Sequence, residues 1–313
     1  MTDPASDSDG SREPQFSTAF DPAHGRPVSV APGILRVTAD NPSPFTFRGT
    51  NSHVVGDAAR CFVVDPGPAD EAHLAALLEA VDGRRVEAVI LTHTHSDHSA
   101  LAMRLAAEVS APLLGARRKA APPPAAGVPV LDAEPAGDLA FARHLEDGET
   151  LDLGDRSVEV VATPGHASDH VALALSGSGI LLSGDHVMAW STSVVAPPDG
   201  SMGDYMASLE KLLSRSETRY LPGHGGPVER PVSFVKALLH HRRMRETAIL
   251  KRLDAGDETI PAIVAAIYPG LDPRLQGAAG LSVLAHLEDL QARRLVCSAA
   301  SPGGAAVYWP AAR

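Results

Sequence analysis

The first two thirds of the chain alternate short apolar segments with turn-forming residues. Apolar or alternating stretches bounded by Gly, Pro, Asn or Asp are typical of strands. Strands are predicted over 33–40, 45–56, 59–67, 86–92, 148–154, 156–165, 170–175 and 179–185. Residues 218–228 indicate a further strand that runs into a glycine-rich loop. Leucines and alanines at helical spacing predict helices over 69–81, 100–109 and 202–215. Strands and helices in mixed order indicate an α/β fold.

The pattern changes after Pro231. A long basic segment at 232–256 and two shorter segments at 259–270 and 274–294 have the periodicity of helices. Residues 295–309 indicate two strands around a Ser-Pro-Gly-Gly turn. Three helices followed by a hairpin form the pattern of a winged helix.

Composition therefore predicts three parts. Residues 1–27 are rich in Asp, Ser and Pro, and we expect a disordered acidic N-terminal tail. Residues 28–230 are expected to form the α/β domain, and residues 231–313 a winged-helix-like C-terminal domain. The Pro/Ala-rich stretch 119–138 has the composition of a loop or insertion.

Charge and cysteine content narrow the class of protein. The formal net charge of −11 argues against non-specific nucleic-acid binding, although residues 232–313 hold ten Lys and Arg against seven Asp and Glu. Cys61 and Cys297 lie far apart and favour a reducing compartment, with Cys61 expected in the core. The acidic start is unlike a targeting segment, and no apolar run reaches the roughly 18–20 residues of a membrane span. We expect a soluble cytoplasmic protein without membrane contact.

One short stretch concentrates side chains that bind metals. Residues 91–100, LTHTHSDHSA, place His93, His95, Asp97 and His98 within six positions directly after a predicted strand. Imidazole and carboxylate are ordinary ligands for zinc and similar ions. Four ligands from six consecutive residues are too cramped for one ion, so the motif indicates two neighbouring ions.

Three further predicted strands end in ligand-bearing loops that contain glycine. His166 lies in TPGHAS, Asp185 in LSGDH and His224 in LPGHGG. Glycine lets the backbone come close to a site. Seven ligands from four strand ends fit a binuclear centre, in which Asp185 is well placed to bridge the two ions.

These motifs resemble those of the metallo-β-lactamase superfamily, over residues 33–224. The resemblance implies a four-layered αββα sandwich. It places His93, His95 and His166 on the first metal, Asp97, His98 and His224 on the second, and Asp185 between them. Asp65, at the end of CFVVDPG, would support the ligands without binding metal.

A closer resemblance extends over the remaining chain. GTNSHVVG, TPGHASDHVAL, SGDHVM, DYMASLEKLL and HHRRMRETAIL, with the winged-helix tail, are similar to the beta-lactamase-like endoribonuclease branch. Ala100 stands where many relatives have glycine, and the 119–138 insertion and the acidic tail are also departures. None of them changes a ligand. In this branch the tail is expected to shape the entrance of the site.

The ligand set predicts metal-assisted hydrolysis. A hydroxide held between two divalent ions is a nucleophile at neutral pH, because the metals lower the water pKa toward about 7. Asp97 and Asp185 are the predicted catalytic carboxylates. We expect zinc, while manganese and iron also suit these nitrogen and oxygen ligands.

Three classes of function remain open at this point. Single-stranded RNA is the first substrate, because Arg242, Arg243, Arg245 and Lys251 lie on the basic helix; a solvated helix face is the competing interpretation. A small ester, thioester or lactone, as in glyoxalase II-like enzymes, is the second. A DNA-binding winged-helix regulator is the third, disfavoured by a wing turn without Lys or Arg.

Three residues outside the ligand set are candidate contacts of the site. His170 is predicted to support a ligand, and Asn51 and Tyr205 are predicted to touch substrate. A homo-oligomer is possible in this class of protein, and the sequence does not identify the assembly.

Overall fold

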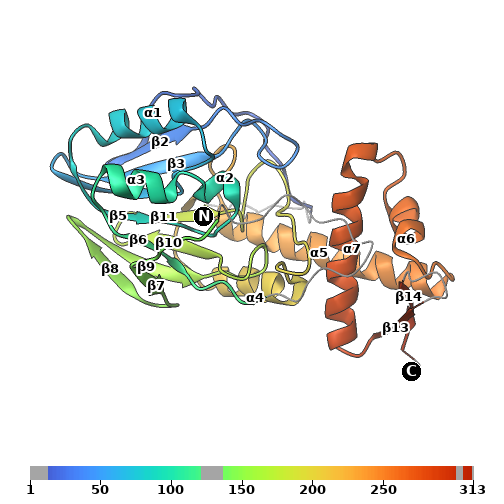
Figure 1. Ribbon diagram of the computed structural model, residues 1–313. Coiled ribbons are helices and arrows are strands. Elements are labelled where there is room, and N and C mark those ends of the chain that lie inside the picture. Colours follow the sequence, from blue (N-terminus) through green and yellow to red (C-terminus); the bar gives the residue numbers. More distant parts are fainter. Residues whose placement is uncertain (1–12, 121–136, 301–305, 312–313) are drawn as a thin grey trace, which may run out of the picture.

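The computed structural model describes residues 13–120, 137–300 and 306–311 (Figure 1). Two β-sheets lie face to face, with helices on their outer faces and a helical C-terminal part to one side. The first sheet has the strand order β1-β2-β3-β4-β5-β6-β7. Its strands are Val28–Ala31, Ile34–Thr38, Asn51–Gly56, Arg60–Val64, Arg85–Ile90, Leu113–Ala116 and Arg143–Leu145.

The second sheet has the order β12-β11-β10-β9-β8. Its strands β8 to β12 are Thr150–Leu153, Arg156–Ala162, Val171–Leu175, Ile180–Gly184 and Arg219–Pro222. The helices among the described residues of this part, α1 to α4, are Glu71–Val81, Ser96–Ser99, Ala102–Glu108 and Met202–Leu212. β4, β5, β6 and β7 run parallel, as do β11 and β12, so several strand ends meet at the same edge.

The layers follow from which side of each strand is apolar. Val55 and Phe62 of the first sheet pack between the sheets against Leu173 and Leu182 of the second. The alternate residues of β3 and β4 pack under α1 and α3. A third apolar cluster lies between the second sheet and α4 with the next helix, α5 (Pro231–Asp254). The αββα sandwich expected from the motifs is confirmed.

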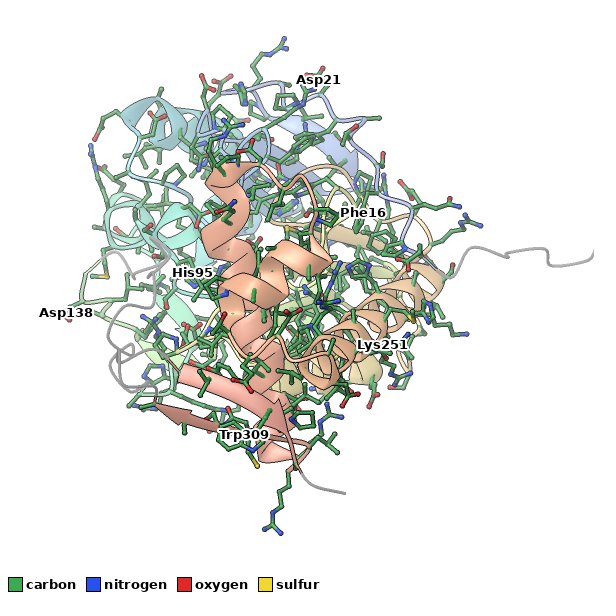
Figure 2. All side chains as sticks on the ribbon, turned by 90° about the vertical axis from the view of Figure 1, so that its right-hand side faces the viewer. Phe16, Asp21, His95, Asp138, Lys251 and Trp309 are labelled. Carbon is green, nitrogen blue, oxygen red and sulfur yellow. The ribbon has the colours of Figure 1, made fainter. Side chains whose placement is uncertain are left out.

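The C-terminal part has the predicted three helices and hairpin. They are α5, α6 (Ile260–Ile267), α7 (Gln276–Ala292), β13 (Val296–Ala300) and β14 (Ala306–Pro310), with a short 3-10 helix, Pro273–Leu275, before α7. Figure 2 shows these elements facing the viewer, with Trp309 on the hairpin. No helix among the described residues is long and apolar enough to cross a membrane.

α5 belongs to both parts of the molecule. Val235 and Leu238 in its first half join the cluster under the second sheet, whereas Ile249 and Leu253 in its second half join the core of the C-terminal part. The two parts therefore share a continuous helix after Pro231, and no loose linker separates them there.

The N-terminal segment is more ordered than its composition predicts. The prediction of a disordered tail over 1–27 is wrong from residue 13 onward; residues 1–12 lie outside the described part. The Ser17 backbone N–H donates to the Ala189 carbonyl at 2.8 Å, and the rings of Phe16 and Phe234 meet edge to face at 6.1 Å. Phe16 and its neighbours gain apolar partners only when distant parts of the chain come together.

Other predictions near the site also needed correction. The strand predicted over 45–56 begins only at Asn51, because Phe47 and Gly49 have positive φ angles of 57° and 125° that no strand accommodates. The short strands β6 and β7 were not predicted. Most of the 119–138 insertion, residues 121–136, lies outside the described residues.

Candidate metal centre

The five segments that build the centre all begin at strand ends along one edge of the sandwich. In the first sheet, β4 is followed by Asp65, and β5 by the His93–His98 motif. In the second sheet, His166 follows β9, Asp185 follows β11 and His224 follows β12. Parallel strands carry these residues to the same edge, so the two sheets contribute ligands from opposite sides.

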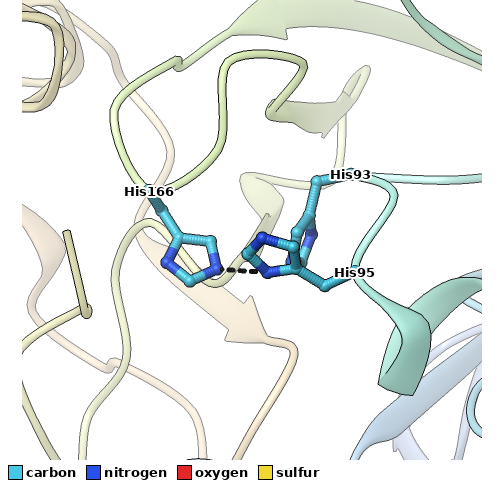
Figure 3. Close-up of side chains that lie close together, drawn as sticks. All are labelled: His93, His95 and His166. Atoms are coloured by element: carbon cyan, nitrogen blue, oxygen red, sulfur yellow. Dashed lines mark hydrogen bonds between the residues drawn. The ribbon is translucent and has the colours of Figure 1, made fainter. Parts of the chain in front are cut away.

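All seven predicted ligands come together there. Three groups have candidate ligand atoms within 4.8 Å of one another. They are His93, His95 and His166; His93, His98 and Asp185; and Asp97, His98 and His224. Figure 3 shows the first group, in which His166 Nε2 and His95 Nδ1 lie 3.0 Å apart.

Asp185 lies between the groups. One of its oxygens, Oδ2, is 3.1 Å from His224 Nε2 and 3.8 Å from His166 Nε2. The other, Oδ1, is 3.5 Å from His98 Nε2. The carboxylate of Asp185 thus lies near imidazoles of both predicted metal sets, as a bridging ligand requires.

The distances between ligand atoms suit metal ions. A tetrahedral ion with bonds of about 2.05 Å separates its ligand atoms by roughly 3.3 Å. His98 Nε2 lies 3.3 Å from His224 Nε2, and His224 Nε2 lies 3.3 Å from Asp97 Oδ2. Among the described residues, His93 Nε2 and Asp185 Oδ1 are buried and have no hydrogen-bond partner. Such groups are costly to bury unless something binds them, so the residues fit a metal centre.

A network around Asp65 orients two of the imidazoles. Asp65 accepts hydrogen bonds from the Thr92 N–H at 2.7 Å and the Thr92 hydroxyl at 2.7 Å, and it contacts His98 Nδ1 at 3.0 Å. Because the Thr92 hydroxyl donates to Asp65, it can only accept from His93 Nδ1, 3.0 Å away. Both histidines then carry their proton on Nδ1 and turn an unprotonated Nε2 toward the centre.

The other ligands are held by backbone carbonyls and hydroxyls. His166 Nδ1 donates to the Val194 carbonyl at 2.6 Å, and the Thr50 hydroxyl donates to Asp97 Oδ2 at 3.1 Å. Asn51 donates to the carbonyls of Pro222 and Gly225, on either side of His224. The contacts of His166 and Asn51 leave the ligand nitrogens free, and the bond from Thr50 leaves further lone pairs on the Asp97 carboxylate.

His170 has the supporting position expected of it. Its Nδ1 lies 2.8 Å from the Thr163 hydroxyl, and its Nε2 accepts the Asp185 backbone N–H at 3.0 Å. Both ring nitrogens are therefore engaged by the protein. His170 fixes the backbone of the central carboxylate and has no nitrogen left for a metal.

Burial and charge divide the centre into two electrostatic halves. Burial lowers the pKa of His95 to about 3, and the nearby His166 adds to the effect. Burial also lowers the pKa of His224, but Asp185 and Asp97 outweigh it and raise that pKa to about 9. The pKa of His98 is likewise raised, because Asp97, Asp185 and Asp65 outweigh its burial. Burial therefore disfavours a positive charge on His95, whereas the surrounding carboxylates favour one on His98 and His224.

Two residues predicted as substrate contacts have other positions. Tyr205 is fully buried, and its hydroxyl donates to the His186 carbonyl at 3.1 Å, so it has no surface for a substrate. Asn51 is 1% exposed, and its amide group is used in holding the His224 loop. The prediction for both is corrected: they lie close to the centre and support it from within the fold.

Sequence reasoning missed the threonines of the site. Thr92 and Thr163 are the residues directly before the HTHSDH and PGH motifs, and Thr50 precedes Asn51. Their position directly before a ligand motif or Asn51 was the only local pattern that could have indicated a supporting role. Threonine is also a common strand residue, so the signal does not separate support of a ligand from ordinary strand preference.

Comparison with known proteins agrees with this geometry. Residues 45–224 match the metallo-beta-lactamase superfamily, and residues 259–304 match the beta-lactamase associated winged helix domain. The chain therefore belongs to the metallo-β-lactamase superfamily and carries the winged-helix domain associated with it. The predicted family and fold are confirmed.

Particular relatives cover most of the chain. It is 31% identical over 270 residues to the beta-lactamase-like protein 2 homolog of Drosophila melanogaster, covering 82% of this chain and 87% of that protein. It is 26% identical over 227 residues to the atrochrysone carboxyl ACP thioesterase of Cryptosporiopsis sp., covering 72% and 64%. The crystal structure of a beta-lactamase domain protein from Burkholderia ambifaria has the same fold, with a TM-score of 0.78, 24% identity and coverage of 95% and 97%.

Proposed function

We propose that this protein is a hydrolase that uses two divalent metal ions, with zinc as the expected metal, to cleave a thioester or a related ester. The observation that carries the proposal is the set of three overlapping ligand groups. The group His93, His98 and Asp185 shares one histidine with each of the other two. Two such ions, when bound, polarise a carbonyl oxygen and lower the pKa of a coordinated water to about 7.

The chain's own residues would hold and orient these ions. His93, His95 and His166 form one set, Asp97, His98 and His224 the other, and Asp185 joins them. Asp65, Thr92 and His170 keep the ligands in place through the bonds described above. The rigid placement of ligands on strand ends serves catalysis, because it avoids reorganisation during the reaction.

Asp97 is the proposed catalytic carboxylate that a substrate can reach. Its side chain is 27% exposed, against 9% for Asp185, so it lies on the open side of the centre. Its Oδ2 is engaged by Thr50 and lies near His224. A substrate can therefore reach Asp97, whereas Asp185 is covered. Burial alone would raise the pKa of Asp97, but His98 and His224 outweigh it and hold that pKa well below its usual range, so Asp97 acts as a carboxylate.

The partners of the arginines on the basic helix, α5, bear on the choice of substrate class. Arg242 is buried, Arg243 pairs with Glu210 at 2.9 Å, and Arg245 lies 4.2 Å from the centre of the Tyr268 ring. Of the four residues predicted to supply phosphate-binding charge, Arg242 is therefore unable to do so, Arg243 and Arg245 already have partners, and Lys251 is exposed. One relative is named as a thioesterase, and the acidic net charge also favours a small substrate over RNA.

A substrate panel tests this proposal. Zinc-loaded protein is assayed with an acyl thioester, an aryl ester, a lactone and a single-stranded RNA oligonucleotide, and His95→Ala serves as the inactive control. We expect thioester or ester hydrolysis that His95→Ala abolishes.

The panel also separates the RNA alternative. RNA cleavage that weakens with salt and with Lys236→Ala and Lys251→Ala, two exposed positions of α5, would make RNA the substrate. If metal-loaded protein hydrolyses none of the substrates in the panel, the hydrolase proposal is contradicted.

A further inference from the structure

One loop connects the two halves of the proposed centre. Residues 186–201 link β11 to α4. The loop starts directly after Asp185, and its Val194 carbonyl accepts the hydrogen bond that orients His166. A shift of this loop would therefore move the carboxylate of Asp185 at its start and turn the imidazole of His166, which is bonded farther along it.

Two side chains from outside the loop hold it at these two points. The Tyr205 hydroxyl of α4 donates to the carbonyl of His186, the residue after Asp185. Arg242 of α5 donates from Nη2 to the carbonyl of Ser193, the residue before Val194. The Arg242 guanidinium also lies 5.2 Å from the centre of the Tyr205 ring, so the two holding groups contact each other.

The burial of Arg242 distinguishes it from the rest of the basic helix. Arg242 is 4% exposed, whereas the side chain of the next residue, Arg243, is 62% exposed and pairs with Glu210 on the surface. Taking a guanidinium out of water costs free energy that one neutral carbonyl does not fully return. A leucine or methionine would fill the same space without that cost, so packing alone does not explain an arginine at this position.

We propose that Arg242 is a positioning residue for the metal centre. From the helix shared with the C-terminal part, it fixes the Ser193 carbonyl and thereby the next carbonyl, Val194, which orients the ring of His166. Tyr205 fixes the start of the same loop beside Asp185. The inference rests on the proposed function, because it assumes that His166 and Asp185 bind metal. It also gives α5 a role in the centre that needs no contact with substrate.

A purely structural arginine predicts a different result. If Arg242 only stabilised the packing of α5, its replacement would lower the free energy of unfolding and leave metal affinity unchanged. A positioning role predicts weaker metal binding in protein that is still folded. The metal affinity, measured by competition with a coloured chelator, separates these two cases.

The experiment compares Arg242→Met, Arg242→Lys and the control Arg243→Met in the full-length chain, with Zn²⁺ as the probe. Loss of a group that orients a ligand typically weakens metal binding 10–100-fold. We expect at least about a tenfold loss for Arg242→Met, concentrated in one of the two bound equivalents, and partial recovery in Arg242→Lys. Arg243→Met should bind both equivalents as the parent does.

The outcomes are distinguishable. Folded Arg242→Met with the parent's affinity for both equivalents overturns the inference. If Arg242→Met does not fold, Tyr205→Phe decides, because it keeps the ring and removes only the hydroxyl, which donates to the His186 carbonyl and contacts Arg242. Weaker metal binding supports the inference, and unchanged binding overturns it. A parent protein that binds no Zn²⁺ overturns the proposed function and the inference with it.

Discussion

Replacing Gly223 by alanine adds one methyl group where the backbone comes closest to the centre. A Cβ atom at this position would lie 2.5 Å from Asp185 Oδ1 and 2.7 Å from His98 Cε1. The Gly223 backbone cannot retreat, because its N–H donates to the Gly184 carbonyl at 2.9 Å and its carbonyl accepts the Asn51 N–H at 2.7 Å. The Asp185 carboxylate would therefore have to move by about 0.9 Å to reach an ordinary contact.

The expected magnitude follows from this displacement. Overpacking of a filled site costs about 1–3 kcal/mol in the free energy of unfolding. A catalytic group displaced by about 1 Å can cost roughly 100-fold in rate, so a 10–100-fold loss in kcat/KM is expected here. The affinity for the second metal equivalent should fall with it, because Asp185 and His98 both shift.

Gly226→Ala is the matched control. It adds the same methyl group in the same loop, but the nearest atom would lie 3.5 Å away. Metal titration, steady-state kinetics and chemical unfolding of the two variants measure the effect. If Gly223→Ala kept metal affinity and kcat/KM within about twofold of Gly226→Ala, the close approach of this loop to the carboxylate would have no functional role.

Two other predictions address the central carboxylate and the C-terminal core. Asp185→Asn should reduce kcat/KM more than Asp65→Asn does. Asp65 only orients Thr92 and His98, so Asp65→Asn should weaken metal binding about 10–100-fold. Equal losses of kcat/KM, or the reverse order, would show that the bridging carboxylate is assigned wrongly. His286 is 1% exposed on α7, and burial, followed by Arg242, Arg245 and Arg293, lowers its pKa to about 3. Below its unfolded pKa of 6.5 the unfolded chain takes up a proton that the folded protein does not, so stability falls as the pH drops from 6.5 toward 3. At pH 5 this costs about 2 kcal/mol, and His286→Leu should remove that part of the loss in urea unfolding; parallel pH profiles for parent and variant would contradict it.

The ligands of the centre could be predicted because their signals are local. HTHSDH places four ligands on one strand end, and PGH, SGD and PGHG each pair a ligand with glycine. The close approach of Gly223 to Asp185 shows why that glycine is needed. The layered arrangement was also predictable. Strands covered on both faces need apolar residues at consecutive positions, and such runs indicate a sheet between other layers.

The supporting residues could not be predicted from local pattern. Arg242 has the sequence environment of a solvated helix, HHRRMR, and only the Ser193 carbonyl and the Tyr205 ring, 49 and 37 positions away in sequence, explain its burial. Phe16 lies in a polar segment and gains a partner only through Phe234. Such contacts depend on tertiary structure, which overrides composition.

The most direct test of the account is the number of metal ions that the protein binds. Metal-free protein is titrated with Zn²⁺ and analysed by elemental mass spectrometry after removal of free metal, together with His95→Ala. The account predicts two equivalents per chain for the parent, because seven ligands converge in overlapping groups around Asp185, and the loss of at least one equivalent in His95→Ala. A parent that binds one equivalent or none after reconstitution would contradict the binuclear centre.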